Sequence, residues 1–458
     1  MNPFKFITHP SEISSWLGVV TALGLLLTLV GSVSGAGVFP YTVHKTVLDN
    51  GLTVLIVPFD SPGVVAYYTV VRTGSRNEVE PGHSGFAHFF EHMMFRGTEK
   101  YPEDKYNDML KAIGADTNAS TTDDFTTYYI NASASALDTI MDLESDRFQN
   151  LKYSEPAFRT EAGSILGEYN KNNSIPFQSL FEKLRDTAYT THTYKHTTMG
   201  FLADIQDMPN QYEYSLKFFD RWYRPENCVL IIVGDVQSDS TLAMVKKYYG
   251  NWKRGTYQLQ KTVEPPQTSP RQGHVEWKNR TLPYLVLAYH VPAFSTDNLD
   301  GPALDLLSQL VVSETSPLYQ KLVIENQQVD FLGGGWGKHR DPYLFTIQTR
   351  IKKPADQAAV QKDIEDALQS AQTQLFSEAQ LNRARSFLKY SFLMGLNTPS
   401  AIARQLTSYA ELTADPASMD QYFAMYEQVT PQKLQEVAKR YFKPENQTQI
   451  TLSTGGAR

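Results

Sequence analysis

Cysteine is nearly absent from the chain, since Cys228 is the single thiol among 458 residues. One thiol cannot form an internal disulfide, and it excludes zinc sites built from several cysteines. A basic excess is also missing, because 42 lysines and arginines face 49 aspartates and glutamates. Nucleic acid is therefore not an expected partner. With 41% hydrophobic and 20% charged residues, the composition is that of a globular protein large enough to fold without disulfides.

Charged residues are missing near the N-terminus, between Glu12 and Lys45. Inside that gap, residues 16–33 form an apolar run, and the small residues 34–36 fit the cleavage pattern of export signals. The run is long for a signal peptide and barely long enough to cross a bilayer. We therefore predict that residues 1–36 are a signal peptide or, alternatively, a membrane anchor; a buried helix is a third interpretation. Either of the first two makes the protein exported, as a periplasmic protein or one anchored facing the periplasm.

The chain contains an internal repeat. The sequence RWYRPEN begins at Arg221, RYFKPEN begins at Arg440, 219 residues later, and an apolar run follows each copy. Both copies have the form of a helix end, a proline turn and a strand. The match predicts two homologous halves, which we place at 37–260 and 275–458, joined by a Pro-rich linker at 261–274.

Each half mixes the two types of secondary structure. Strands are expected at 52–57, 64–71 and 284–291, and helices at 83–95, 137–148 and 303–312. The order is strand, strand, helix, helix rather than strict alternation. This order predicts an α+β fold instead of a Rossmann-type sheet.

The strongest chemical signal is the sequence HFFEH at residues 88–92. On a helix, His88 and His92 share one face and can bind the same metal ion, while Glu91 projects beside it as a base for a metal-activated water. A catalytic zinc site needs a third protein ligand and one open position. Glu161 and Glu168 are two helical turns apart on a helix-like stretch, and their spacing alone leaves either as the ligand.

The stretch GFAHFFEHMMFRGTEKYP at 85–102, followed by the two glutamates, resembles the inverzincin metallopeptidases. That family includes pitrilysin, insulin-degrading enzyme, mitochondrial processing peptidase and short bacterial relatives that bear the metal motif. The resemblance implies one Zn²⁺ per chain, held by the two histidines of the motif and by Glu168, which lies 76 residues beyond His92. It implies that Glu91 is the general base and that Glu161 is a supporting catalytic carboxylate.

The resemblance also covers residues 114–129. In the family this region holds an edge strand that pairs with an extended substrate, so Asn118, Ala119 and Ser120 are expected to bind substrate through the backbone. The implied fold is two halves, each a largely antiparallel sheet packed with helices, facing each other as a clamshell around the site. The implied activity is zinc-dependent hydrolysis of peptides or unfolded polypeptides.

The second half has lost the metal motif. The 219-residue offset maps the motif onto Leu307, Leu310 and Val311, which cannot bind metal. Where the family carries an Arg/Tyr pair that contacts substrate, this chain has Val323 and Asp330. We therefore predict a heterodimer in which a sister subunit supplies the pair, with a homodimer as the other assembly. The alternative function is a non-catalytic structural subunit of the same fold, although the complete ligand set argues against it.

His192 and His196 also have the spacing of a metal-binding pair. The surrounding threonines and the following glycine make a poor helix, and no carboxylate is near in sequence. We expect polar residues on the surface or facing substrate instead of a second metal site.

Overall fold

The computed structural model describes residues 31–33 and 37–455. The predicted signal or anchor therefore lies almost entirely outside the described residues. Within these two ranges, no helix has both the length and the apolar character needed to cross a bilayer.

The first half is built on a seven-stranded sheet with the order β1-β2-β3-β7-β4-β6-β5. Its strands are β1 (Gly31–Val33), β2 (Val43–Val47), β3 (Thr53–Pro58), β4 (Val64–Val71), β5 (Asp116–Thr121), β6 (Thr126–Ser133) and β7 (Cys228–Gly234). Only β3 and β7 pair in parallel, and all other neighbours are antiparallel.

The second half is built on a five-stranded sheet with the order β10-β11-β9-β12-β8. Its strands are β8 (Arg271–Trp277), β9 (Tyr284–Val291), β10 (Val329–Trp336), β11 (Tyr343–Ile351) and β12 (Gln447–Thr454). Here only β12 and β8 pair in parallel. Strands β8-β12-β9-β11-β10 thus repeat the order of β3-β7-β4-β6-β5. The prediction of an α+β fold with two homologous, largely antiparallel halves is confirmed.

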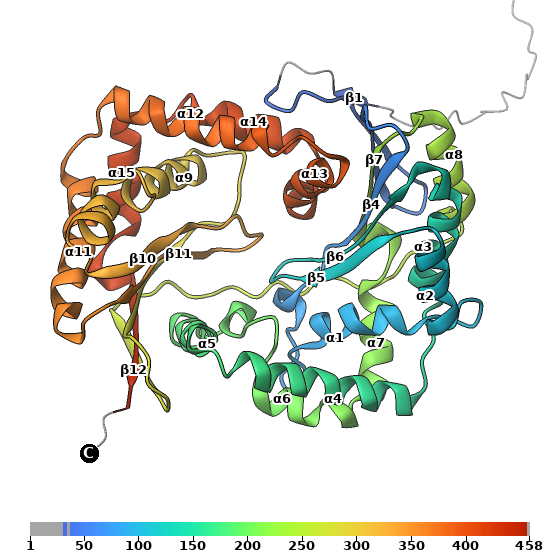
Figure 1. The fold of residues 1–458 in the computed structure, drawn as a ribbon, viewed down its shortest axis with the longest axis horizontal. Coiled ribbons are helices and arrows are strands. Elements are labelled where there is room, and N and C mark those ends of the chain that lie inside the picture. The colour runs from blue at the N-terminus through green and yellow to red at the C-terminus, as the bar shows by residue number, and fades with distance from the viewer. Residues whose placement is uncertain (1–30, 34–36, 456–458) are drawn as a thin grey trace, which may run out of the picture.

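Helices cover both sheets (Figure 1). The first half has α1 (Phe86–Met93), α2 (Glu103–Ala112), α3 (Leu137–Asn150), α4 (Glu155–Asn172), α5 (Pro176–Ala188), α6 (Leu202–Asp207), α7 (Tyr212–Trp222) and α8 (Ser238–Tyr249). The second half has α9 (Asp300–Val311), α10 (Pro317–Tyr319), α11 (Gln357–Thr373), α12 (Glu378–Met394), α13 (Pro399–Thr413), α14 (Ala417–Tyr426) and α15 (Pro431–Tyr441).

Two equivalent helices are exchanged between the halves. Helix α5 packs against β8 and β12 of the second sheet, and α13 packs against β4 and β7 of the first sheet. Both helices begin with proline, Pro176 and Pro399, at equivalent places in the repeat. The inner face of each sheet is therefore closed by a helix from the other half, as the central positions of α5 and α13 show (Figure 1). Strand β8 starts within the range expected for the linker, and the domain boundaries themselves stay a prediction.

The tips of two equivalent hairpins meet at the junction of the halves. The β5–β6 turn contributes Asp124, whose Oδ2 lies 2.8 Å from Nδ1 of His339 in the β10–β11 turn. Asp341 of the same second-half turn accepts a 2.5 Å hydrogen bond from Nε of Arg76. These side chains are buried or nearly so, and removing one partner of such a pair leaves an uncompensated charge. The halves are thus joined by charge as well as by apolar packing.

The sequence predicts His192 and His196 to lie on the surface or to face substrate. This prediction of exposure is wrong, because both side chains are buried. Nε2 of His192 lies 3.1 Å from Oδ2 of Asp341. Nδ1 of His196 lies 2.9 Å from the backbone carbonyl of Thr197. The partner of His192 is distant in sequence and reaches it only through the meeting of the two halves.

Candidate metal centre

Helices α1 and α4 supply the predicted metal ligands. Helix α1 begins after Gly85, whose φ of 93° is in the left-handed region that glycine adopts without strain. The turn is tight, since a Cβ at Gly85 would come within 2.9 Å of the carbonyl oxygen of Met199. Helix α4 begins after Ser154, whose hydroxyl accepts a hydrogen bond from the N–H of Ala157.

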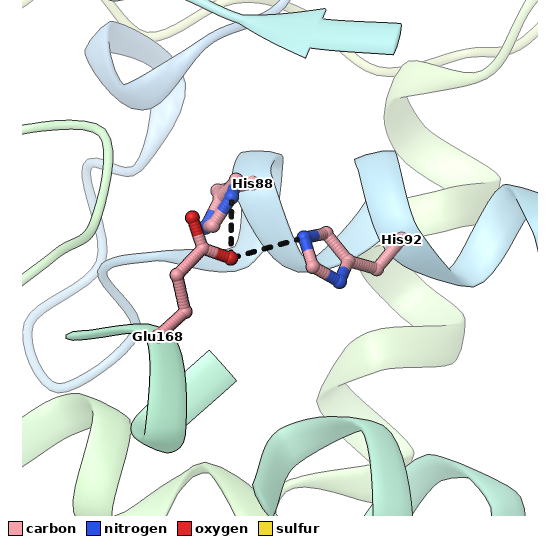
Figure 2. A group of neighbouring side chains, drawn as sticks. All are labelled: His88, His92 and Glu168. Atoms are coloured by element: carbon pink, nitrogen blue, oxygen red, sulfur yellow. Dashed lines mark ion pairs between the residues drawn. The ribbon is translucent and has the colours of Figure 1, made fainter. Parts of the chain in front are cut away.

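The three ligand atoms converge on one point (Figure 2). Oε2 of Glu168 lies 3.8 Å from Nε2 of His88 and 3.5 Å from Nε2 of His92. All three atoms lie within 4.8 Å of one another. Zinc bonds of about 2.0–2.1 Å in tetrahedral geometry separate the ligands by roughly 3.3–3.5 Å. The three side chains therefore fit one zinc ion and leave one coordination position for another group.

Glu161 orients one of the two histidines. Nδ1 of His92 lies 2.9 Å from Oε1 of Glu161, so that Nδ1–H is the donor and the lone pair of Nε2 is left for a metal. The other oxygen of Glu161 accepts a 2.8 Å hydrogen bond from Nε of Arg96. Arg96 also pairs with Glu103 on α2. This chain of contacts fixes both the tautomer and the orientation of the His92 ring.

The surroundings shift the pKa values of the two histidines in opposite directions. Burial, helped by the neighbouring His92, lowers the pKa of His88 to about 4, so the ring is neutral near pH 7 as a ligand must be. The hydrogen bond to Glu161 raises the pKa of His92. Burial opposes ionisation of Glu161, but the hydrogen bonds from His92 and Arg96 outweigh it and lower the pKa of its carboxyl.

Glu91 lies beside the predicted ligands, and a residue of the sheet holds its side chain in place. Its Oε2 accepts a 2.6 Å hydrogen bond from the hydroxyl of Thr121, the last residue of β5. Burial raises the pKa of Glu91, while the Thr121 hydroxyl acts in the opposite direction. A carboxylate with a raised pKa is a stronger base than an exposed one, and this property suits proton transfer near neutral pH.

The predicted substrate-binding residues lie on an edge strand. Within the described chain, β5 pairs only with β6, and its other edge is open. Asn118 and Ser120 are exposed, and Ala119 is half-buried. The N–H of Ala119 donates to the side-chain Oδ1 of its neighbour Asn118 at 2.8 Å. Thr121 then connects this edge directly to Glu91, so the three predicted positions lie next to the candidate base.

Glu78 belongs to the site but has no signature in the sequence. Its two carboxylate oxygens each accept a 2.7 Å hydrogen bond, from the N–H of Gly85 and the N–H of Ala87 at the start of α1. The side chain is buried, and burial raises its pKa to about 8. Glu78 follows closely on Arg76, which is held by Asp341 of the second half. The start of helix α1 is thus tied to the junction of the halves.

Comparison with known proteins decides the family. The sequence model of the insulinase family, peptidase family M16, matches residues 61–201, and the model of the M16 inactive domain matches residues 211–388. The chain belongs to peptidase family M16. The resemblance to inverzincin metallopeptidases is therefore confirmed, and the matched regions include helices α1 and α4, which carry the predicted ligands.

Several M16 relatives span nearly the whole chain. The zinc protease PqqE of Helicobacter pylori is 28% identical over 435 residues, which cover 93% of this chain and 96% of that protein. A probable mitochondrial-processing peptidase subunit beta of Arabidopsis thaliana is 25% identical, covering 86% and 75%. The crystal structure of a Helicobacter pylori protease has a TM-score of 0.84 at 28% identity and covers 91% of this chain and 100% of that chain.

Proposed function

We propose that this M16 protein is a zinc metallopeptidase that hydrolyses peptide bonds in peptides or unfolded polypeptides. The observation that carries the proposal is the convergence of His88, His92 and Glu168 within 4.8 Å, next to the half-buried carboxylate of Glu91. The relatives named zinc proteases support the same activity. The proposed ligand set is these three residues, for one Zn²⁺ per chain.

Glu91 is the proposed general base. A zinc ion held at the site would supply Lewis-acid activation of a water molecule. Glu91 then accepts a proton at its carboxylate and passes it to the leaving amine. The hydroxyl of Thr121 holds the carboxylate in place during both transfers. Glu161 acts through His92, whose ring it orients, rather than by touching substrate.

Substrate is proposed to bind as an added strand along β5. The open edge of β5 presents backbone groups at Asn118, Ala119 and Ser120, and an extended peptide can pair with them. Pairing requires the N–H of Ala119 to leave the Asn118 side chain and donate to a substrate carbonyl. Recognition through the backbone suits an enzyme that accepts many sequences in extended form.

The chain is proposed to work with a sister subunit, or with a second copy of itself. The ligands remain accessible, since the side chains of His92 and Glu168 are 29% and 37% exposed. A second subunit would cover them and supply the Arg/Tyr pair. At the positions expected for that pair, Val323 is half-buried and Asp330 is paired with Arg350 of this chain. Three relatives are named as the beta subunit of mitochondrial-processing peptidase, two of them as probable.

Export is also proposed. The apolar run at 16–33 is the main support, and a second is the fold of the periplasmic protease PqqL from Escherichia coli, which matches with a TM-score of 0.72 at 20% identity. This chain covers 48% of that protein. Fractionation of cells into cytoplasm, periplasm and membranes tests the proposal, and a purely cytoplasmic chain contradicts it.

Metal removal tests the proposed activity. The chain, alone and with its partner, is treated with a chelator and assayed on a quenched fluorescent peptide. Hydrolysis is expected to stop and to return when one equivalent of zinc is added back. A chain that binds zinc but hydrolyses no peptide in either assembly favours the structural subunit instead.

A further inference from the structure

The second half has a counterpart of the helix pair that carries the proposed metal ligands. Helix α9 follows β9 as α1 follows β4, and it contacts α12 as α1 contacts α4. Helix α12 begins after the capping residue Ser377, and α4 begins after the capping residue Ser154. Figure 1 shows α4 and α12 along opposite edges of the molecule. Rotating one half by a half-turn about the viewing direction would bring one helix near the position of the other. The pair α9 and α12 therefore occupies the same place in its half as the pair that carries the metal ligands.

A cleft of about 660 Å³ opens at this place. Leu310 lines the cleft and aligns with Glu91 when the halves are matched by the 219-residue offset of the repeat. Ala384 also lines it and aligns with Glu161 when the halves are matched on the two capping serines. The counterparts of the base and of the supporting carboxylate are thus apolar. The second half thus keeps the helix pair but lacks these two carboxylates.

The lining of the cleft combines apolar surface with one positive charge. Leu310, Pro317 and Phe387 form apolar walls, and Phe387 is 53% exposed. Arg383 is exposed and supplies the cation, while none of the described residues that line the cleft is acidic. Oε1 of Gln380 caps α12 by accepting hydrogen bonds from Ser377, and its NH₂ group can donate to a peptide carbonyl.

We propose that this cleft binds a peptide segment that carries an aspartate or glutamate beside an apolar residue. The carboxylate pairs with Arg383 and the apolar side chain covers Phe387, so the charge and the apolar surface of the cleft are both matched. The apolar strip continues along α12 through Tyr390 and Met394, which are 61% and 72% exposed. An extended peptide can follow that strip. The proposal rests on the proposed function for its class of ligand, a peptide.

A charge swap tests the cleft. The full chain carries Glu91→Gln so that it does not hydrolyse the probe. The probe is an amidated peptide of sequence Gly-Leu-Phe-Glu-Leu-Gly with a neutral fluorophore. The protein is titrated into this peptide, and fluorescence anisotropy gives the Kd. Arg383→Glu is expected to raise the Kd at least tenfold and to reverse the preference when lysine replaces the glutamate of the peptide. Arg280→Glu, an exposed arginine outside the cleft, is the matched control and is expected to leave the Kd unchanged.

The apolar contact has its own pair of variants. Phe387→Ser is expected to weaken binding of both peptides, whereas Val263→Ser, which removes a 69% exposed side chain elsewhere, is not. Equal Kd values for Arg383→Glu and Arg280→Glu overturn the proposal. The proposal is also overturned if Arg383→Glu converts a dimer into a monomer, because the cleft is then a contact between subunits. A wild-type chain that binds the peptide through Arg383 but never hydrolyses peptides overturns the proposed function alone.

Discussion

Nδ1 of His92 lies 2.9 Å from Oε1 of Glu161, and Glu161 is two turns before the proposed ligand Glu168 on the same helix. Helix α4 therefore carries both a proposed ligand and the group that orients a second proposed ligand, His92. Such outer partners of metal-binding histidines raise affinity by fixing the ring and its tautomer.

Glu161→Gln is expected to lower zinc affinity by about 10–100-fold, the usual effect of losing an outer partner of a ligand. The physical reason is that the His92 ring loses a charged acceptor for Nδ1–H. Competition with a chromophoric chelator measures the affinity. Glu155→Gln, at the exposed start of the same helix, is the control. Equal affinities for the two variants would show that Glu161 has no role in binding.

Glu91→Gln is expected to leave one zinc bound per chain and to lower kcat/KM by about 10²–10⁴-fold, the usual contribution of a general base. The glutamine keeps the shape of the side chain but cannot take a proton. Metal analysis and hydrolysis of a fluorescent peptide are measured on the same sample. Hydrolysis at the wild-type rate contradicts the assignment of Glu91 as base.

Thr121→Val is expected to shift the acid limb of the kcat/KM profile to higher pH. The Thr121 hydroxyl stabilises ionised Glu91 and so lowers its pKa, and its removal lets burial raise that pKa further. Because the base must be ionised, activity then appears only at higher pH. A profile identical to that of the wild type would contradict the role given to the hydroxyl.

Glu78→Gln is expected to weaken zinc binding about fivefold, because loss of a helix cap typically costs about 1 kcal/mol and the helix carries two ligands. The glutamine NH₂ cannot accept the second hydrogen bond that the carboxylate receives. The absorption spectrum of the cobalt-substituted chain is expected to change as well. Glu411→Gln, another buried carboxylate, on α13, is the matched control; an equal loss in both variants would mean general destabilisation.

Glu411 is expected to make the fold less stable as pH rises. Burial raises its pKa from 4.5 to about 9, so the folded chain keeps a proton that the unfolded chain releases. Its contribution is fully present below about pH 4.5 and is lost as pH rises towards 9. Glu411→Gln is expected to flatten this fall in melting temperature between pH 5.5 and 8.5. Parallel curves for the two proteins would contradict the assignment.

Local pattern predicts the secondary structure well where the apolar periodicity is strong. Strand β9 spans the expected residues 284–291, but the helix expected from residue 83 begins only at Phe86. The late start reflects the left-handed Gly85 and the capping by Glu78, which lies outside the periodic segment. A carboxylate that acts through a turn leaves no trace in helical spacing.

The long-range contacts could not be predicted in the same way. Helix α5 is amphipathic, but nothing in its sequence indicates that its apolar face packs on the second sheet. His192 lacks a carboxylate nearby in sequence, yet Asp341 contacts it from the other half. The proposed ligand set could be predicted from the sequence because two short helical spacings and a family resemblance define it. The junction is defined only by tertiary structure.

The exchange of α5 and α13 has a further consequence for the history of the chain. Each half covers the sheet of the other with the same element of its own repeat. Two separate copies of a single half would build the same core if each copy packed that helix on the sheet of the other copy. The chain therefore has the architecture of a domain-swapped dimer whose protomers are joined end to end. One protomer of that fused dimer carries the proposed zinc ligands, and the other is free to diverge.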